Sequence, residues 1–381
     1  MEALRAVVVG AGWAGEGHTL ALRNAGVDVV ALCGRSPEPT RARAGQLEVP
    51  LVRFDWRAAI EELQPEIVSI ATPGPTHRAI AEYAAERGCH VVCEKPLASS
   101  AEDGRAMLAA AERAGIKHGY AATGRYAPAT RLARQLVEQG AIGDIHAIEC
   151  YDRWSLPDPV PYSWAFCIEE GGGLLANSFT HKLAQVLHIT GGQVIAYSGT
   201  ATIKREHLPV APMVHDFRQL FGPIPGWDAA KAREWQPTNY DCAYVVVTDI
   251  AIGEQGAVRA VFQESLGVAG PYQPKITVYG EQGALALGNG HHEEQVRLLD
   301  AKRNTWETAP LPADLVPADD GLIDPVQRSW NSFFGEFVAD VQATRPASYP
   351  TFYDGVTAMD IIESAWNNDH RTLLKTRTTT Q

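Results

Sequence analysis

A glycine-rich turn near the N-terminus constrains the fold more than any other feature of the chain. The apolar run 5–9 (RAVVV) leads directly into Gly10-Ala11-Gly12-Trp13-Ala14-Gly15, and a helical pattern follows. Glycines at this spacing allow a tight turn and a close approach of the backbone to a pyrophosphate, which faces the N-terminus of the next helix. We therefore expect Gly10, Gly12, Trp13, Ala14 and Gly15 to bind a dinucleotide, and a purely structural turn is the alternative.

The first 120 residues alternate between two kinds of segment. Runs rich in Val and Ile occupy 5–10, 28–34, 66–72, 89–94 and 116–121, as in strands buried on both faces of a sheet. Between them, 76–88 and 99–115 have helical periodicity, the first with Thr76 as N-cap and Gly88 as its end, the second with Ser99 or Ser100 and Gly115. This order predicts a doubly wound α/β domain with a parallel sheet.

The pattern changes after about residue 124. One more helix is expected at 128–143, and strands at 144–154, 241–252, 257–265 and 275–287 then succeed one another, which predicts a large, mostly antiparallel sheet. Helical segments at 325–341 and 353–368 close the chain and can pack back on the first domain. We therefore divide the chain into 1–124 and 125–381. The Pro-rich segment 204–238 is either a lid or a surface excursion.

Composition limits the possible surroundings and partners. Six cysteines show no C-x-x-C spacing, and no apolar run reaches membrane length. We therefore expect a cytoplasmic protein with reduced thiols and without a secretion signal. The formal net charge of -12 argues against nucleic acid as a partner. Adjacent His291 and His292 on a predicted turn indicate a solvated hairpin, and we expect no metal site.

The end of the second predicted strand bears on which dinucleotide binds. An acidic residue usually contacts the ribose there in NAD sites, but this chain has Gly34, Arg35 and Ser36. A guanidinium can pair with a 2′-phosphate that a carboxylate would repel. We therefore expect NADP(H), contacted by Arg35 and Ser36; the alternative is NAD(H), with Arg35 in an exposed loop.

A Glu-Lys-Pro sequence follows the fourth of these runs. Glu94 and Lys95 lie at its carboxyl end, where open α/β sheets bind ligands, and Pro96 restricts Lys95 to an extended backbone. A lysine there could hold a substrate hydroxyl and stabilise a developing alkoxide, while Glu94 neutralises or orients it. Periodicity alone favours a surface Glu-Lys pair before a loop.

Four strings together carry a resemblance to a known family. They are GAGWAGEGH (10–18), VSIATPGPTHRAIAEYAAERGCHVVCEKPLA (68–98), GAIGDI (140–145) and GGGLLANSFTH (171–181). With them the chain resembles the glucose-fructose oxidoreductase / inositol dehydrogenase (Gfo/Idh/MocA) family. The resemblance implies a Rossmann domain, a C-terminal α+β domain whose open sheet often forms an oligomer interface, and NAD(P)-dependent chemistry on a sugar or cyclitol. A homodimer or homotetramer is the expected assembly.

The resemblance also implies roles for individual residues. Lys95 matches the catalytic lysine of the family, and Glu94 accompanies it at the cofactor. Thr72, Pro73 and His77 match a loop that usually lies beside the nicotinamide ribose.

Asn177 and His181 raise the question of proton transfer. His181 matches a general acid/base of the family, whereas Asn177 lies where an aspartate is usual. If a helix begins near Ser178, both side chains can face one cleft. The residues alone favour His181 as an ordinary residue of a first helical turn, whereas the resemblance favours a catalytic role. Because an amide cannot accept a proton, the transfer would fall to His181, or to Lys95 with a lowered pKa, or dehydrogenase activity is lost.

Polar and aromatic residues near the expected cleft complete the candidate site. Residues 125–126 begin the second domain and 151–154 belong to its first strand. A flat aromatic ring beside hydroxyl-binding groups suits a sugar, and a partly exposed strand face is the alternative. The candidate substrate-binding residues are Arg125, Tyr126, Tyr151, Arg153 and Trp154.

The sequence thus predicts an oxidoreductase that transfers a hydride between nicotinamide and a secondary alcohol or ketone carbon of a sugar, sugar derivative or cyclitol. One alternative is a lyase- or hydrolase-like enzyme that oxidises its substrate transiently with a tightly bound cofactor. The other is a non-enzymatic dinucleotide sensor, which the substitution at Asn177 allows but which Lys95 and His181 disfavour.

Overall fold

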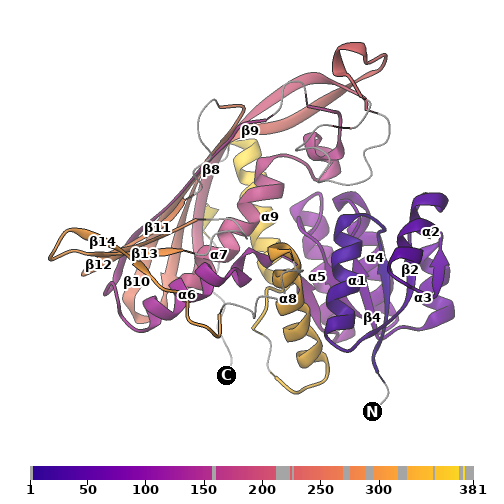
Figure 1. Ribbon diagram of the computed structural model, residues 1–381, viewed down its shortest axis with the longest axis horizontal. Helices are drawn as coiled ribbons and strands as arrows, with labels where there is room; N and C mark the ends of the chain where they lie inside the picture. Colours follow the sequence, from indigo (N-terminus) through magenta and orange to yellow (C-terminus); the bar gives the residue numbers. More distant parts are fainter. Residues whose placement is uncertain are drawn as a thin grey trace.

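Two β-sheets organise the molecule (Figure 1). The computed structural model describes residues 3–156, 160–211, 224, 227–268, 275–288, 295–315, 324–345, 348–368 and 372–373. The predicted turn at His291 and His292 and most of the segment 212–226 lie outside these residues.

The N-terminal sheet is parallel and has the strand order β3-β2-β1-β4-β5-β6. Its strands are β1 (Arg5–Val9), β2 (Asp28–Cys33), β3 (Leu51–Arg53), β4 (Ile67–Ile70), β5 (His90–Cys93) and β6 (His118–Tyr120). The helices between them are α1 (Trp13–Asn24), α2 (Pro37–Gln46), α3 (Trp56–Leu63), α4 (His77–Glu86) and α5 (Ala101–Ala114). This confirms the doubly wound fold. The three-residue edge strand β3, which is too short to show a period, and the helices α2 and α3 were not predicted.

The ends of the helices that flank this sheet are determined in part by local sequence. The Ser100 hydroxyl accepts a hydrogen bond from Asp103 N at 3.0 Å and caps α5, and Gly115 ends it with φ 64°. Thr76 precedes α4 as predicted, but its hydroxyl donates to Thr72 Oγ1 and Pro73 O. Thr76 is therefore the N-cap residue, as predicted, but its side chain makes no capping hydrogen bond to a backbone N–H of the helix.

The second sheet has the strand order β14-β13-β12-β11-β7-β10-β9-β8-β15. Among the described strands of this second sheet, only β7 and β10 pair in parallel, which confirms a mostly antiparallel sheet. The strands are β7 (Ile145–Trp154), β8 (Gln193–Pro209), β9 (Trp235–Ile252), β10 (Gly256–Leu266), β11 (Lys275–Gly280), β12 (Gly283–Leu287), β13 (Val296–Asp300), β14 (Thr305–Ala309) and β15 (Thr372–Leu373).

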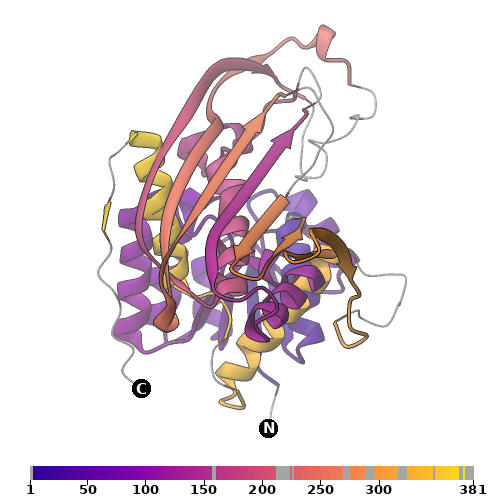
Figure 2. The same ribbon diagram turned by 90° about the vertical axis from the view of Figure 1, so that its left-hand side faces the viewer.

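Helices cover one face of this sheet, and the other face is turned to the viewer in Figure 2. Helix α6 (Pro128–Glu138) packs on β12 and β13, and α9 (Phe352–Asn367) packs on β8 and β9. Helix α7 (Thr180–Thr190) lies against α6 and α9. The sheet therefore presents one face to the helices and leaves its second face open among the described residues.

The C-terminal helices contact the first sheet's helices. Helix α8 (Pro325–Val341) packs against α1, and α9 packs against α5. One apolar core joins β1 and α1 to Phe333, Phe334 and Phe337 of α8, and a larger core runs from the first sheet to the second. The boundary at residue 124 stays a prediction.

Three further properties apply to the described part of the chain. None of its helices is long and apolar enough to cross a membrane. No group of three or more His, Cys, Asp or Glu side chains in it is arranged to hold a metal ion. All six cysteines are free thiols.

Candidate active site

The glycine turn has the geometry that a dinucleotide requires. A Cβ on Gly10, whose φ is 123°, would lie 2.1 Å from Ala71 O, and one on Gly15 would lie 1.9 Å from Gly10 O. Gly12 is the N-cap of α1 and provides no side-chain cap, so N–H groups of the first turn remain available to an anion. Trp13 and Ala14 form that turn, and both are half-buried. These residues fit a dinucleotide pyrophosphate.

Arg35 follows the second strand, where the residue that contacts the ribose of the dinucleotide was predicted. Strand β2 ends at Cys33, and Arg35 is exposed in the short connection to α2. Ser36 is the N-cap residue of α2 and is also exposed.

Glu94 is buried and supports the loop that carries Lys95. Its Oε1 lies 3.0 Å from His18 Nε2 and accepts from Trp330 Nε1 at 3.2 Å, and its Oε2 accepts from Lys95 N at 2.9 Å. Burial by itself would raise the pKa of Glu94, but the contacts with His18 and Lys95 lower it overall. The surface-pair interpretation is therefore wrong for Glu94, which joins α1, α8 and the loop after β5.

His77 supports the neighbouring loop in a similar way. It is fully buried, with Nδ1 3.1 Å from Leu97 O and Nε2 2.6 Å from Thr72 O. Burial lowers the pKa of His77. Thr72 is half-buried and Pro73 exposed at the end of β4, so His77 holds this loop from beneath.

Lys95 and Asn177 meet between the two sheets. Lys95 follows β5, its peptide bond to Pro96 is cis, and its Nζ lies 3.3 Å from both the carbonyl oxygen and Oδ1 of Asn177. Asn177 Nδ2 donates to Gly173 O at 2.9 Å, which turns its oxygen toward the ammonium group. Burial lowers the pKa of Lys95, although Glu94 opposes this shift. The pair offers a cationic donor beside an amide.

The helix that carries Asn177 and His181 begins earlier than the sequence predicted. Its first helical residue is Leu174, a π-helical turn spans Leu175–Phe179, and α7 continues from Thr180. The cap comes from a distant strand, because Asp241 Oδ2 on β9 accepts from Leu175 N at 2.8 Å. A start near Ser178 is therefore wrong, and His181 does not lie in the first turn. Such π-helical turns often occur at functional sites.

His181 faces the start of the second domain. It is half-buried, and its Nδ1 accepts from Gly124 N at 3.4 Å. Gly124 belongs to the 3₁₀ turn Thr123–Tyr126, and a Cβ there would come within 3.2 Å of the His181 Cβ. With Nδ1 as acceptor, the neutral imidazole carries its proton on Nε2.

The cap residue Asp241 titrates near neutral pH. It is fully buried, and its Oδ1 also accepts from Trp366 Nε1 at 3.0 Å. Burial raises the pKa of Asp241 to about 7, although the bonds from Leu175 and Trp366 oppose the shift.

We expect this carboxyl group to make stability depend on pH. Because the folded-state pKa is raised, its contribution to the free energy of unfolding is fully present below about pH 4 and is lost as the pH rises through about 7. The Tm of the wild type minus that of Asp241→Asn should therefore fall between pH 5 and pH 8. Differential scanning fluorimetry of both proteins across this range measures the difference, and parallel curves would contradict the assignment.

Some candidate substrate residues point away from Lys95. On β7, Tyr151 and Arg153 are exposed and alternate with Asp152 and Trp154, which face the helices. The hydroxyl of Tyr126 donates to Glu336 Oε2 of α8 at 2.7 Å. The structure does not bring Tyr126, Tyr151 or Arg153 to Lys95. Half-buried Arg125 lies beside Gly124, its guanidinium 5.7 Å from the Tyr126 ring.

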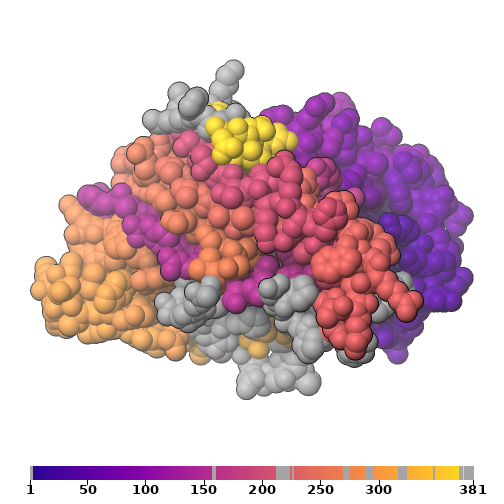
Figure 3. All heavy atoms as spheres, turned by 90° about the horizontal axis from the view of Figure 1, so that it is seen from above, coloured from indigo at the N-terminus to yellow at the C-terminus, as the bar shows by residue number. Residues whose placement is uncertain are grey.

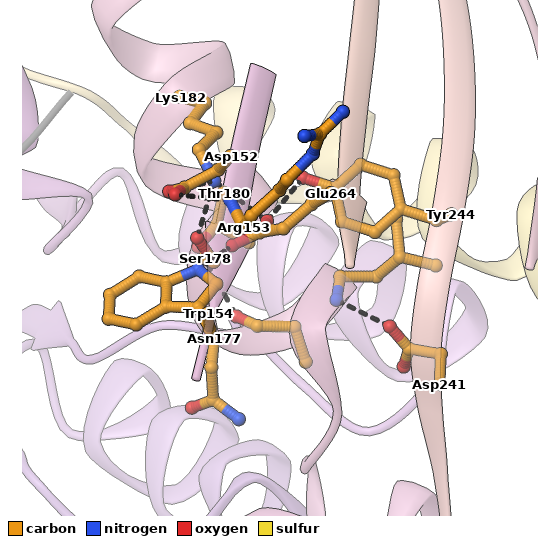
Figure 4. A network of polar contacts seen from close by, with 12 residues as sticks. Asp152, Arg153, Trp154, Asn177, Ser178, Thr180, Lys182, Asp241, Tyr244 and Glu264 are labelled. Atoms are coloured by element: carbon orange, nitrogen blue, oxygen red, sulfur yellow. Dashed lines mark hydrogen bonds and ion pairs between the residues drawn. The ribbon is translucent and has the colours of Figure 1, made fainter. Parts of the chain in front are cut away.

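Sequence reasoning missed a buried ionic cluster next to this helix (Figure 4). Lys182 Nζ lies 3.0 Å from Asp152 Oδ2, 2.7 Å from Glu264 Oε2 and 2.8 Å from Ser178 Oγ. Trp154 Nε1 also donates to Glu264. A charged residue at a core-facing position was the available signal, since Glu264 and Asp152 each occupy a buried position of a strand.

Comparisons with known proteins place the chain among oxidoreductases. A family model described as "Oxidoreductase family, NAD-binding Rossmann fold" matches residues 4–121, and one described as "GFO/IDH/MocA C-terminal domain" matches 130–286. The chain is 29% identical over 272 residues to levoglucosan dehydrogenase of Pseudarthrobacter phenanthrenivorans, covering 68% of each chain. It is 24% identical over 359 residues to inositol 2-dehydrogenase of Rhizobium meliloti, covering 94% of each.

Solved structures share the fold. An oxidoreductase domain protein from Kribbella flavida superposes with a TM-score of 0.80 at 24% identity, over 99% of this chain and 100% of that chain. Levoglucosan dehydrogenase in complex with NADH superposes with a TM-score of 0.78 at 21% identity, over 98% of this chain and 100% of that chain.

Proposed function

Because the chain belongs to the Gfo/Idh/MocA oxidoreductase family, with its NAD-binding Rossmann domain, we propose that it is a dehydrogenase or reductase of a sugar, sugar derivative or cyclitol. The carbon that reacts is a secondary alcohol or ketone carbon. One observation carries the proposal: the Lys95 ammonium group lies 3.3 Å from Asn177 Oδ1, beyond the carboxyl end of β5 in the parallel sheet. The named relatives that act on levoglucosan and inositol support the substrate class.

Lys95, Asn177 and His181 have different roles in the proposed reaction. Lys95 donates hydrogen bonds to the substrate oxygen and stabilises its negative charge. Asn177 positions a neighbouring hydroxyl, and His181 exchanges the proton of the reacting oxygen through Nε2. A nicotinamide bound beside them would supply or accept the hydride. Lys95 also has a lowered pKa and is the second group that could move a proton.

The first test is the absorbance of reduced nicotinamide. The wild type is incubated with NADP+ or NAD+ and pools of inositols, pyranoses and their acids, and we expect one pool to produce reduced cofactor. A protein that binds dinucleotide but reduces none of it with any pool would contradict the proposal. A cofactor that stays bound through purification would then favour the lyase-like alternative, and capture of a protein partner the sensor.

We propose NADP(H) as the preferred cofactor, with NAD(H) as the alternative. The exposed guanidinium of Arg35 at the end of β2 supports NADP(H), and no acidic residue occurs between Cys33 and Pro37. Complexes of levoglucosan dehydrogenase with NADH show that this relative binds the unphosphorylated cofactor.

Arg35→Ala separates the two possibilities. It should weaken NADP+ binding about 10- to 100-fold, the range of a lost charge-assisted hydrogen bond, and leave NAD+ binding nearly unchanged. Titration of intrinsic fluorescence with each cofactor gives both dissociation constants. Arg41→Ala is the matched control, because Arg41 is exposed on α2 and packs on Phe54. Equal loss with both cofactors, or none, would contradict the preference.

We further propose a cytoplasmic homodimer or homotetramer assembled through the open face of the second sheet. Tyr151, Gln263 and Val245 form a row across β7, β10 and β9, and the two apolar members are 41% and 39% exposed. Exposed apolar side chains on an open sheet face suit an interface. Sedimentation velocity measures the number of subunits in the assembly.

The six free thiols support the proposed location in the cytoplasm, where thiols stay reduced.

A further inference from the structure

The cluster of Lys182, Asp152, Glu264 and Ser178 satisfies one buried ammonium group completely. An ammonium has three N–H donors, and Lys182 Nζ has three acceptors, at 3.0 Å (Asp152 Oδ2), 2.7 Å (Glu264 Oε2) and 2.8 Å (Ser178 Oγ). The three charged residues are each at most 2% exposed. Buried charges with complete hydrogen bonding hold their partners in one geometry, because any displacement leaves a charge unpaired.

Glu264 connects this cluster to the indole ring of Trp154. Its Oε2 accepts from Lys182 and, at 2.7 Å, from the Tyr244 hydroxyl, while its Oε1 accepts the indole N–H of Trp154. Glu264 pairs with Asp152 across the parallel strands β10 and β7, so Trp154 lies two residues beyond the cluster on the same face. Figure 4 shows the indole on the side of the cluster toward Asn177.

The same cluster reaches the helical turn of the active site. Ser178, which accepts from Lys182, follows Asn177 directly within the π-helical turn, and Lys182 follows His181. One carboxylate therefore holds Trp154 with one oxygen and, through Lys182, the Asn177 turn with the other. The orientation of the ring and that of the turn depend on a single side chain.

We infer that Glu264 is a positioning residue for sugar recognition: it fixes the Trp154 indole as a wall of the substrate pocket, in register with Asn177. This inference rests on the proposed function. A flat indole held by its N–H presents its apolar face to the ring of a polyol, and a fixed ring loses little conformational entropy on binding. Trp154 was a candidate substrate residue from the sequence, and Glu264 is the group that orients it.

The substitution Glu264→Gln tests this dependence because an amide has only one acceptor oxygen. That oxygen is required by the Lys182 ammonium group, which makes the stronger, charge-assisted bond. The amide nitrogen then faces the indole N–H, two donors meet, and the ring is released. The pair of Lys182 and Asp152 keeps a balanced charge, so the fold should survive.

We expect the KM for the sugar to change while kcat stays nearly constant. Glu264→Gln should raise the KM for the sugar about 3- to 10-fold, the range of one neutral hydrogen bond, with kcat and the KM for the cofactor changed less than about twofold. Tyr244→Phe is the matched control, since it removes another donor to Glu264 without touching Trp154, and its KM should stay at the wild-type value. In a Trp154→Phe background Glu264→Gln should add nothing, because the N–H that it orients is absent.

A spectroscopic measurement tests the orientation itself. The indole N–H resonance of Trp154, assigned by its loss in Trp154→Phe, should shift in Glu264→Gln and stay in place in Tyr244→Phe. An unshifted resonance, an unchanged KM, or additive effects in the double variant would each overturn the role of Glu264 while wild-type turnover of a sugar upholds the proposed function. A wild type that turns over no sugar would overturn both.

Discussion

Replacing Lys95 by Ala should lower kcat about 10³-fold, at the upper end of what loss of one donor to a developing oxyanion costs, because the site loses its charge as well. The ammonium group lies 3.3 Å from Asn177 Oδ1 in a half-buried position, where its field is screened less than at the surface. Dinucleotide affinity should stay nearly intact, since the glycine turn and Arg35, which we propose to contact the dinucleotide, lie at other strand ends. Stopped-flow absorbance gives the rate, and a fluorescence titration gives the affinity.

The matched variant for this experiment is Lys95→Met. It keeps most of the apolar stem and removes the charge, so it should lose as much turnover as Lys95→Ala while melting at a higher temperature. If either variant loses dinucleotide binding in proportion to turnover, Lys95 is a cofactor-binding residue. Turnover near the wild-type level would remove it from the mechanism altogether.

His181→Asn should lower kcat about 10²- to 10⁴-fold, the usual contribution of a positioned general acid or base. The amide oxygen of Asn can take the place of Nδ1 and still accept from Gly124 N, so the helix should keep its contact with the 3₁₀ turn. What the variant cannot do is exchange a proton. The KM for the sugar should therefore change much less than kcat in steady-state assays.

His188 provides the control on the same helix. It lies two turns further along α7, and burial together with Arg125 and Arg134 lowers the pKa of His188 to about 2, so it stays neutral. His188→Asn should leave kcat close to the wild-type value. If His181→Asn also keeps its kcat, the proton passes through another group, and Lys95, whose pKa burial lowers, becomes the first candidate.

Much of the first domain could be predicted from the sequence because its signals are local. The cap at Ser100 and the end of α5 at Gly115 are decided within a few residues, and the structure confirms both. Thr76 is likewise the N-cap residue predicted for α4, although its hydroxyl makes no capping hydrogen bond and instead donates to Thr72 and Pro73. The position of a cap is thus a local signal, whereas the partners of its side chain depend on the neighbouring loop.

The candidate site was only partly predictable from the sequence. It depends on which face of the sheet each residue of β7 points to, and on a helix cap that comes from a distant strand. Residues 151–154 were considered together, yet alternation along β7 sends Tyr151 and Arg153 to the open face and Trp154 to the helix side. The helix of Asn177 begins at Leu174 because Asp241, more than 60 residues away, caps it. A single sequence does not reveal either the parity of a strand or the partner of a distant carboxylate.

The parallel sheet, the glycine turn and the position of Lys95 at a strand end follow from the amino-acid sequence, since these depend on the hydrophobic period, on the space around a backbone and on neighbours in the chain. Which side chains contact one another depends on tertiary packing. It brought Trp330 of α8 and His18 to Glu94, Asn177 to Lys95, and Glu264 to Lys182 and Trp154. These contacts form because buried polar groups need hydrogen-bond partners, and the partners come from segments that are distant in the sequence but adjacent in the fold.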